Sequence, residues 1–267
     1  MDLDIINMKS NKCVILIPIY KEFINFDEYR SIQNTINLYN DKYDIFFMCN
    51  NKLNISFYKN IFNIDYKIFD YNLFHDAHSY SDLLINRFFY KQFLIYEFML
   101  IAQHDAYIFN TYSLEYFMNK NYPYLGALFK LYDLENLLEI EFINDAFNNN
   151  YNVKDLKKII FEKYNTNFNY CINCTLGMSG GLSLRKIDVI YHLLKQNLEW
   201  HWAEDLKICS MLDTHNLFDN ILIKDIINFS MENEKYLDFY KEHNILPYSV
   251  HGIPYYFFMN MYDRILE

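Results

Sequence analysis

Short apolar runs alternate with amphipathic stretches through the first half of the chain. The apolar runs are rich in β-branched and aromatic residues and are too short for helices, which is typical of strands buried on both faces of a sheet. Four such strands are predicted, at residues 12–18, 43–51, 65–71 and 98–102. The stretches between them predict helices at 26–39, between 51 and 65, and at 79–97, the last with Ser79 or Ser81 as its N-cap.

The second half of the chain continues this alternation less regularly. Residues 106–109 continue the apolar run of the fourth strand; further strands are predicted at 122–128 and 181–186, and helices at 111–119, 186–196 and 203–213. Segment 130–172, rich in acids and asparagines, predicts two helices joined by a polar turn. The alternation predicts an α/β protein with a mixed, mainly parallel sheet flanked by helices. Since no repeat or linker divides the chain, we expect one domain over residues 1–267.

Composition limits the classes of function. Hydrophobic residues make up 52% of the 267-residue chain, enough to bury a large core. The net charge of −10 has the wrong sign for a protein that grips nucleic acid through its phosphates, so no nucleic-acid partner is expected. No apolar run is long enough to cross a bilayer and no export signal is visible, so we expect a cytoplasmic protein.

Glycine is scarce, and three of the five glycines fall in the segment TLGMSGG. Glycine permits a positive φ and lets another group approach the backbone closely. Gly180 and Gly181 are therefore expected either in a tight turn or beside a ligand. The segment also matches the Gly-x-Ser-x-Gly pattern of serine hydrolases at Ser179. That pattern needs a helix directly after the serine, whereas a strand is predicted here.

Carboxylates occur at two positions where chemistry is expected. Asp105 follows the fourth predicted strand, and open α/β sheets bind ligands beyond the carboxyl ends of their strands. A carboxylate there can hold Mg²⁺, Mn²⁺ or a sugar hydroxyl; otherwise it forms an Asx turn or a helix cap. Glu204 and Asp205 begin a predicted helix after Trp200 and Trp202. They either complement the helix dipole or provide a general base beside a sugar stacked on the indoles.

Two histidine-containing segments are further candidates. His251 stands next to a glycine, where it is either a structural histidine or a ligand of a metal or a diphosphate. His75, Asp76 and His78 form a second cluster, interpreted either as a polar loop or as a ligand cluster.

Five motifs in a fixed order resemble one known family. They are Pro-x-Tyr-Lys-Glu at 18–22, Gln-x-Asp-Ala-x-x-Phe at 103–109, Tyr-x-Tyr-x-Gly-Ala at 122–127, Gly-Gly-x-Ser-Leu-Arg-Lys at 180–186 and Glu-Asp at 204–205. In order and spacing they resemble a bacterial branch of the GT-A type nucleotide-sugar glycosyltransferases, over roughly residues 12–255 apart from 130–172. The resemblance implies a GT-A-like, Rossmann-type fold in which 130–172 is a helical insertion on the acceptor side.

The resemblance also implies roles for single residues. Asp105 matches a carboxylate of the family's Asp-x-Asp motif, and Gln103 stands at the position of its first Asp, a departure that leaves one acid. His251 would complete a metal or diphosphate site, and Asp205 would be the catalytic base, supported by Glu204. The remaining implied contacts are Ile19, Tyr20, Asn50, Gly180 and Gly181 with the nucleotide sugar, and Trp200 and Trp202 with the acceptor.

These implications predict a glycosyltransferase that moves a sugar from a UDP- or GDP-type donor to a hydroxyl of a surface glycan of the capsule or lipopolysaccharide type. Transfer is expected to invert the anomeric carbon and to use Mn²⁺ or Mg²⁺. With a lipid-linked acceptor, the enzyme would associate peripherally with the inner face of the membrane. Two alternatives stay open: a hydrolase that depends on Ser179, and a nucleotide- or carbohydrate-binding domain without activity, suggested by the missing second acid.

Overall fold

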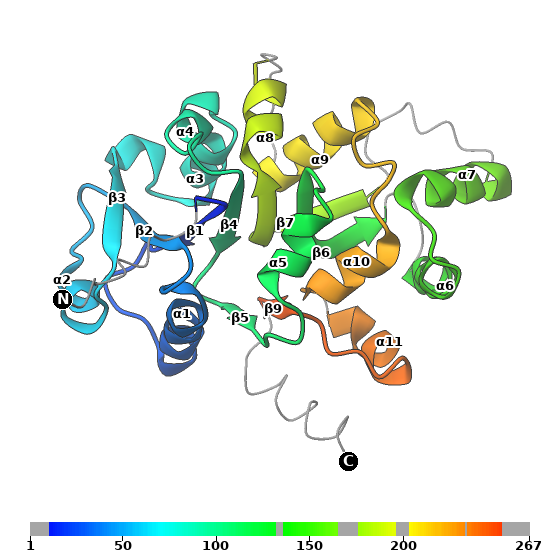
Figure 1. Cartoon of the computed structure of the whole chain (residues 1–267), viewed down its shortest axis with the longest axis horizontal. Helices are drawn as coiled ribbons and strands as arrows, with labels where there is room; N and C mark the ends of the chain where they lie inside the picture. The colour runs from blue at the N-terminus through cyan, green and yellow to red at the C-terminus, as the bar shows by residue number, and fades with distance from the viewer. Residues whose placement is uncertain (1–10, 132–135, 165–175, 196–202, 233, 253–267) are drawn as a thin grey trace, which may run out of the picture.

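A six-stranded sheet runs through the molecule with helices on both sides (Figure 1). The computed structural model describes residues 11–131, 136–164, 176–195, 203–232 and 234–252. The strand order is β3-β2-β1-β4-β7-β6; the first four strands are parallel, and β7 runs antiparallel to both β4 and β6. The strands are β1 (Cys13–Pro18), β2 (Asp44–Asn50), β3 (Asp65–Phe69), β4 (Phe98–Ala102), β6 (Tyr124–Leu131) and β7 (Leu176–Lys186).

Helices on both sides explain why the inner strands β1 and β4 are apolar runs. The edge strand β3, which was predicted to be buried, instead leaves Ile68 58% exposed. The side chains of Cys13 to Ile17 in β1 are at most 1% exposed, and β4 is buried throughout. The predicted α/β class, with a mixed, mainly parallel sheet flanked by helices, is thereby confirmed. The helices are α1 (Phe26–Tyr39), α2 (Ser56–Ile61), α3 (Ala77–Leu84), α4 (Arg87–Lys91), α5 (Leu114–Asn119), α6 (Asn136–Asn148), α7 (Val153–Tyr164), α8 (Ile187–Leu193), α9 (Glu204–Thr214), α10 (Ile223–Phe229) and α11 (Leu237–Glu242).

The stretch 79–97 is not the single helix that its spacing predicts. It contains most of α3 and then α4, which are separated at Asn86. Asn86 has an extended backbone, and its side chain accepts a hydrogen bond from the Phe88 N–H, so it begins a new helix. The N-cap of α3 is Asp76, while Ser79, expected as the cap, is the third helical residue of the capping box.

The glycine-rich segment lies inside a strand and not in a tight turn. Gly177, Gly180 and Gly181 all belong to β7, whose residues are buried from Leu176 to Arg185. Interior glycines weaken a strand unless another group needs to approach its backbone. The groups that do so here belong to the candidate site.

A second sheet of three short strands lies next to the first. Its order is β5-β9-β8, formed by Ala106–Ile108, Ser249–His251 and Ser230–Met231. In register, His251 is opposite Ala106, and Val250 is opposite Met231. The small sheet therefore joins parts of the chain that are more than a hundred residues apart.

The segment 130–172 contains the two predicted helices, α6 and α7, which lie at the end of the molecule away from β3 (Figure 1). The turn between them contains Asn150, which has a φ of +54°. On α7, Lys157 pairs with Asp213 of α9 and, at 2.9 Å, with Asp219. Within the described ranges, no helix is long and apolar enough to cross a membrane.

Candidate functional site

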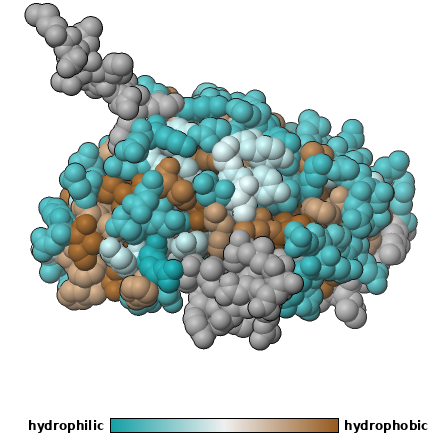
Figure 2. Space-filling model, turned by 60° about the horizontal axis from the view of Figure 1, so that its bottom comes forward, coloured by the Kyte–Doolittle hydropathy of each residue, from teal (hydrophilic) through white to brown (hydrophobic). Residues whose placement is uncertain are grey.

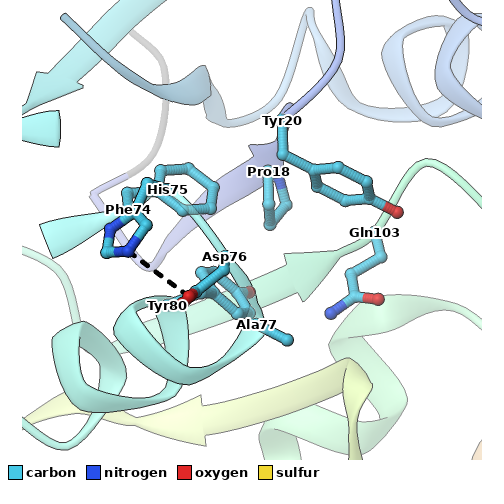
Figure 3. Close-up of a pocket in the computed structure, with 8 residues that line it drawn as sticks. All are labelled: Pro18, Tyr20, Phe74, His75, Asp76, Ala77, Tyr80 and Gln103. Atoms are coloured by element: carbon cyan, nitrogen blue, oxygen red, sulfur yellow. Dashed lines mark ion pairs between the residues drawn. The ribbon is translucent and has the colours of Figure 1, made fainter. Parts of the chain in front are cut away.

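The strand order reverses at β1, and a pocket opens at this point. β1 has β2 on one side and β4 on the other, so the connections diverge and leave a crevice beyond the carboxyl ends of β1 and β4. The pocket has a volume of about 310 Å³. Figure 3 shows the residues that line it: Pro18, Tyr20, Phe74, His75, Asp76, Ala77, Tyr80 and Gln103.

Asn50, at the end of β2, supports the pocket from behind. Its amide donates to the Phe74 carbonyl at 2.7 Å, and its own oxygen accepts from the N–H groups of Lys52 and Leu53. Asn50 is 8% exposed and does not line the pocket, and Ile19 lies in the core. Of the residues expected to contact the nucleotide, Asn50 therefore holds Phe74 in the pocket wall, while Tyr20 and Gln103 line the pocket directly.

Tyr20 separates the pocket from a buried histidine. Its ring centroid lies 4.8 Å from that of His104, which is 3% exposed and has no hydrogen-bond partner at either nitrogen. Burial lowers the pKa of His104, and the nearby carboxylates of Asp105 and Glu28 only partly oppose this effect. Tyr20 thus covers a neutral imidazole.

Two members of the predicted cluster, His75 and Asp76, lie at the start of α3 and line the pocket. Asp76 accepts from the Ser79 N–H at 2.7 Å, and its other carboxylate oxygen lies 3.3 Å from His75 Nε2 (Figure 3). His78 faces Asp82 instead, at 3.7 Å, and does not line the pocket. Asp76 is therefore a helix cap that also faces the ligand space.

His251 is held among three polar side chains. Its Nδ1 lies 3.1 Å from Glu232 Oε1, and its Nε2 lies 3.2 Å from Gln103 Oε1 and 3.4 Å from Asp105 Oδ1. Burial alone would lower the pKa of His251, but the Asp105 and Glu232 carboxylates raise it to about 9. The sequence motifs identify three members of this group and miss Glu232, because no spacing distinguishes it from the nearby acid Glu234.

This group fits a divalent cation when the substrate supplies the other ligands. Asp105 Oδ1 is buried and makes no hydrogen bond, although His251 Nε2 lies 3.4 Å away. Among the described residues, no three His, Cys, Asp or Glu side chains are placed to hold an ion by themselves. Mg²⁺ usually binds through one or two carboxylates plus substrate phosphates and water. Asp105 and His251 fit such an incomplete ligand set.

Arg185 of β7 is a fully buried cation that fixes Glu204. Its Nη2 donates to Glu204 Oε1 at 3.0 Å, its Nη1 to the Tyr90 hydroxyl at 2.9 Å, and its Nε to Ser183 Oγ at 2.9 Å. The guanidinium also lies 5.4 Å from the ring centroid of Tyr124. With its hydrogen bonds satisfied, this buried ion pair holds the beginning of α9 against β7.

Asp205 follows Glu204 and is half-buried. One oxygen accepts from the Gly180 N–H at 3.1 Å, and the other from the Leu206 N–H at 2.7 Å. Burial and the Glu204 charge raise the pKa of Asp205 to about 7, while the backbone hydrogen bonds and Arg185 act in the opposite direction. A carboxyl that titrates near neutral pH suits general acid–base chemistry.

Two side chains explain the paired glycines. A Cβ at position 180 would collide with the Glu204 carboxylate, and a Cβ at position 181 would collide with the His251 ring. Successive residues of a strand point to opposite faces, so the two side chains approach β7 from different sides. Both contacts lie where β7 extends past the end of β4, whose last residue, Ala102, is opposite Leu182. Protein side chains, rather than a ligand, occupy the space in front of both glycines.

Ser179 lacks the setting of a hydrolase nucleophile. It is 4% exposed, its hydroxyl accepts from the Gly181 N–H at 3.3 Å, and β7 continues to Lys186 with no helix directly after the serine. The expectation of a Ser179 hydrolase is therefore wrong on geometry. Trp200 and Trp202, the expected acceptor contacts, lie outside the described residues.

A family model described as "Protein of unknown function (DUF5672)" matches residues 63–251. The chain belongs to this family. The part of the chain that matches DUF5672 runs from just before β3 to the end of β9. It therefore contains Asp105, Asp205, Glu232 and His251. No curated protein matches the sequence.

Solved structures similar to this DUF5672 chain include two X-ray structures of the mannosyltransferase Ktr4p from S. cerevisiae, one of them in complex with GDP. Both are 14% identical in sequence, with TM-scores of 0.40 and 0.42. The matches cover 80% and 78% of this chain and 64% and 62% of those chains. The DUF5672 chain thus spans less than two thirds of their length.

Proposed function

We propose that the protein is a glycosyltransferase whose donor is a nucleoside-diphosphate sugar. One observation carries the proposal: an aromatic pocket and the Asp105–His251 group lie beyond the carboxyl ends of β1 and β4, and the Asp205 carboxyl lies at Gly180, where β7 extends past the end of β4. Such a donor has an aromatic base, a diphosphate and a reacting sugar. These parts require a stacking surface, a cationic or metal-binding site and a nearby base, respectively.

The nucleoside occupies the pocket in this proposal. Its volume of about 310 Å³ suits a small ligand, and the rings of Tyr20, Phe74 and His75 provide apolar faces for a base. Gln103 both lines the pocket and contacts His251, so it connects the nucleoside to the next part of the site. The diphosphate accordingly points from the pocket toward Asp105.

Asp105 and His251 are the proposed protein ligands of Mn²⁺ or Mg²⁺. When bound, such an ion neutralises the charge that develops on the departing diphosphate. Asp105 Oδ1 supports this assignment, because this buried oxygen lies 3.4 Å from His251 Nε2 but makes no hydrogen bond, which leaves it able to accept a further ligand.

Asp205 is the proposed general base. It accepts the proton of the acceptor hydroxyl while that oxygen bonds to the anomeric carbon and the bond from that carbon to the diphosphate breaks. Attack opposite the leaving group inverts the anomeric carbon. The Gly180 N–H orients the Asp205 carboxylate, and the Arg185–Glu204 pair fixes the helix that carries it.

The proposed acceptor is a hydroxyl of a growing surface glycan of the capsule or lipopolysaccharide type, free or lipid-linked, with α6 and α7 as the acceptor-side insertion. The pair packs on the core at the end of the molecule away from β3 (Figure 1). A lipid-linked acceptor requires peripheral association with the cytoplasmic face of a membrane.

Calorimetry with UDP, GDP, CMP and their sugars, each with and without Mn²⁺, tests this function. One nucleoside diphosphate should bind selectively, and binding should weaken in Asp105→Asn but not in the control Asp238→Asn, whose side chain is 96% exposed. A ligand at a hundred times its Kd should stabilise the fold by about 2.7 kcal/mol. Lack of binding by every nucleotide would overturn the proposal. Binding without sugar transfer would identify a binding domain.

A further inference from the structure

We infer that Glu232 is a positioning residue that fixes the His251 ring so that its Nε2 faces a bound metal ion. The inference rests on the proposed function, which places Mn²⁺ or Mg²⁺ at Asp105 and His251. No sequence motif includes Glu232, and its side chain does not line the pocket.

The two nitrogens of His251 face different groups. Nδ1 faces Glu232 at 3.1 Å, while Nε2 faces Asp105 and Gln103. A carboxylate can only accept, so Glu232 requires a proton on Nδ1, and before an ion binds Asp105 requires one on Nε2 as well. A bound ion displaces the Nε2 proton, because a metal-binding histidine must be neutral, while the proton that faces Glu232 stays. A histidine that binds a metal through one nitrogen usually donates its other N–H to a carboxylate, which sets both the tautomer and the ring orientation. The Glu232–His251–Asp105 arrangement has this form.

The His251 ring is also held from the side. It packs against Gly181, where a Cβ would collide with it. Gly181 therefore restricts the position of the ring, whereas Glu232 determines which nitrogen faces Asp105. The two contacts together leave the imidazole one orientation.

Glu232 itself is positioned by the small sheet. It directly follows β8, in which Met231 is opposite Val250 of β9. Ser249 Oγ donates to the Phe229 carbonyl at 2.9 Å and strengthens the same junction. Because β8 and β9 are parallel neighbours, the residue after Met231 lies beside the residue after Val250, which is His251.

Glu232 is not one of the metal ligands in this arrangement. It contacts Nδ1, whereas Asp105 contacts Nε2 on the other edge of the ring. The imidazole thus stands between the two carboxylates. Consistently, the described residues contain no set of three acidic, histidine or cysteine side chains placed around one ion.

Mn²⁺ titration of the full chain, followed by electron paramagnetic resonance with and without the nucleotide that binds best, tests the inference. Glu232→Gln should weaken Mn²⁺ affinity about 10- to 100-fold. Glu232→Asp, which keeps a carboxylate, should recover part of this loss. Glu234→Gln, the same change at an exposed side chain two residues away, should leave affinity unchanged. Melting temperatures verify that each variant folds.

Each result has one reading. If Glu232→Gln and wild type bind Mn²⁺ equally, the positioning role is overturned and the transferase proposal stands. If wild type binds a nucleotide but no Mn²⁺, the positioning role and the metal site are both overturned, while the donor pocket stands. If wild type binds neither, both proposals fall. A loss in Glu232→Gln that Glu232→Asp does not recover at all also counts against the carboxylate's role.

Discussion

The imidazole of His251 occupies the space in which a Cβ of residue 181 would lie. Gly181→Ala should therefore displace the ring or the strand. Overpacking of this kind costs about 1–3 kcal/mol of unfolding free energy. We expect that loss in denaturant unfolding, together with weaker Mn²⁺ binding. Gly252→Ala serves as the comparison for backbone strain without a steric collision. Gly252 has a φ of +68°, which strains any other residue, but an added Cβ there would meet no atom closer than 4.0 Å. If Gly181→Ala binds Mn²⁺ like wild type, the ring does not need this contact.

Asp205 should control how the rate depends on pH. A base must be ionised, and the pKa of this carboxyl is raised to about 7, so kcat should rise with pH through about 7 and then level. Asp205→Asn should lower kcat by about 10²- to 10⁴-fold with little change in nucleotide affinity. Rate profiles from pH 5 to 9 measure both effects. An Asp205→Asn variant with wild-type kcat would exclude the residue as the base.

The same carboxyl has an opposite effect on stability. The folded protein holds this proton more tightly than the unfolded chain, in which the pKa lies near the ordinary 3.8, so the free energy of unfolding falls as pH rises from about 4 to about 7. At pH 8, Asp205→Asn should therefore melt no lower than wild type, although its turnover is strongly reduced. Calorimetric melting at pH 5 and pH 8 tests this. A large destabilisation at pH 8 would mean that the ionised carboxylate supports the fold.

Arg185 and Glu204 should be strongly coupled in stability. Removing one partner of a buried ion pair leaves an uncompensated charge and costs about 3–5 kcal/mol. We expect this loss in Arg185→Met, and a smaller loss when Glu204→Gln is added to it. Denaturant unfolding of the single and double variants gives the coupling energy. Additive losses would contradict the pairing at 3.0 Å.

Tyr20 should contribute to nucleotide binding without supporting the fold. It lines the pocket but is 52% exposed. Stacking of a base on an aromatic side chain contributes about 1–3 kcal/mol, so Tyr20→Ala should weaken nucleotide affinity roughly 5- to 150-fold by calorimetry. Phe23→Ala removes an exposed aromatic ring that does not line the pocket and should change nothing. If Tyr20→Ala and Phe23→Ala change nucleotide affinity equally, the nucleotide base does not stack on Tyr20.

Ser179→Ala should retain activity. The hydroxyl is buried within β7 and accepts one hydrogen bond from the backbone at 3.3 Å, so its loss should cost about 1 kcal/mol of stability and little turnover. Transfer assays with the best nucleotide sugar check this. Abolished activity in a folded variant would revive a nucleophilic serine.

The strands β1, β2 and β4 could be predicted because each is a largely apolar run that is buried in the sheet. The strands β8 and β9 could not, since two and three residues carry no periodicity and their pairing is decided by distant segments. The break at Asn86 was missed for a different reason. The apolar spacing continues across it, while a local side-chain cap ends one helix and begins the next.

The candidate site was predictable where residues follow strands. Asp105 and Gln103 come directly after β4, and Tyr20 after β1, so the geometry of parallel sheets indicates their edge. The other wall of the pocket, with Phe74 and Tyr80, follows no such rule because it lies on the connection after β3 and on α3. Gly180 and Gly181 were expected to contact the nucleotide sugar, but they make room for the side chains of Glu204 and His251. These are tertiary contacts that no local sequence pattern encodes.

The small sheet also fixes when the site can form during synthesis. All six strands of the main sheet have been made once residue 186 has left the ribosome, but Glu232 and His251 follow much later. The residues of the central sheet and of the pocket are therefore all synthesised before the proposed metal ligands are complete. Truncated products that stop before β9 would lack His251 and so could not bind the sugar donor and the metal ion at the same time.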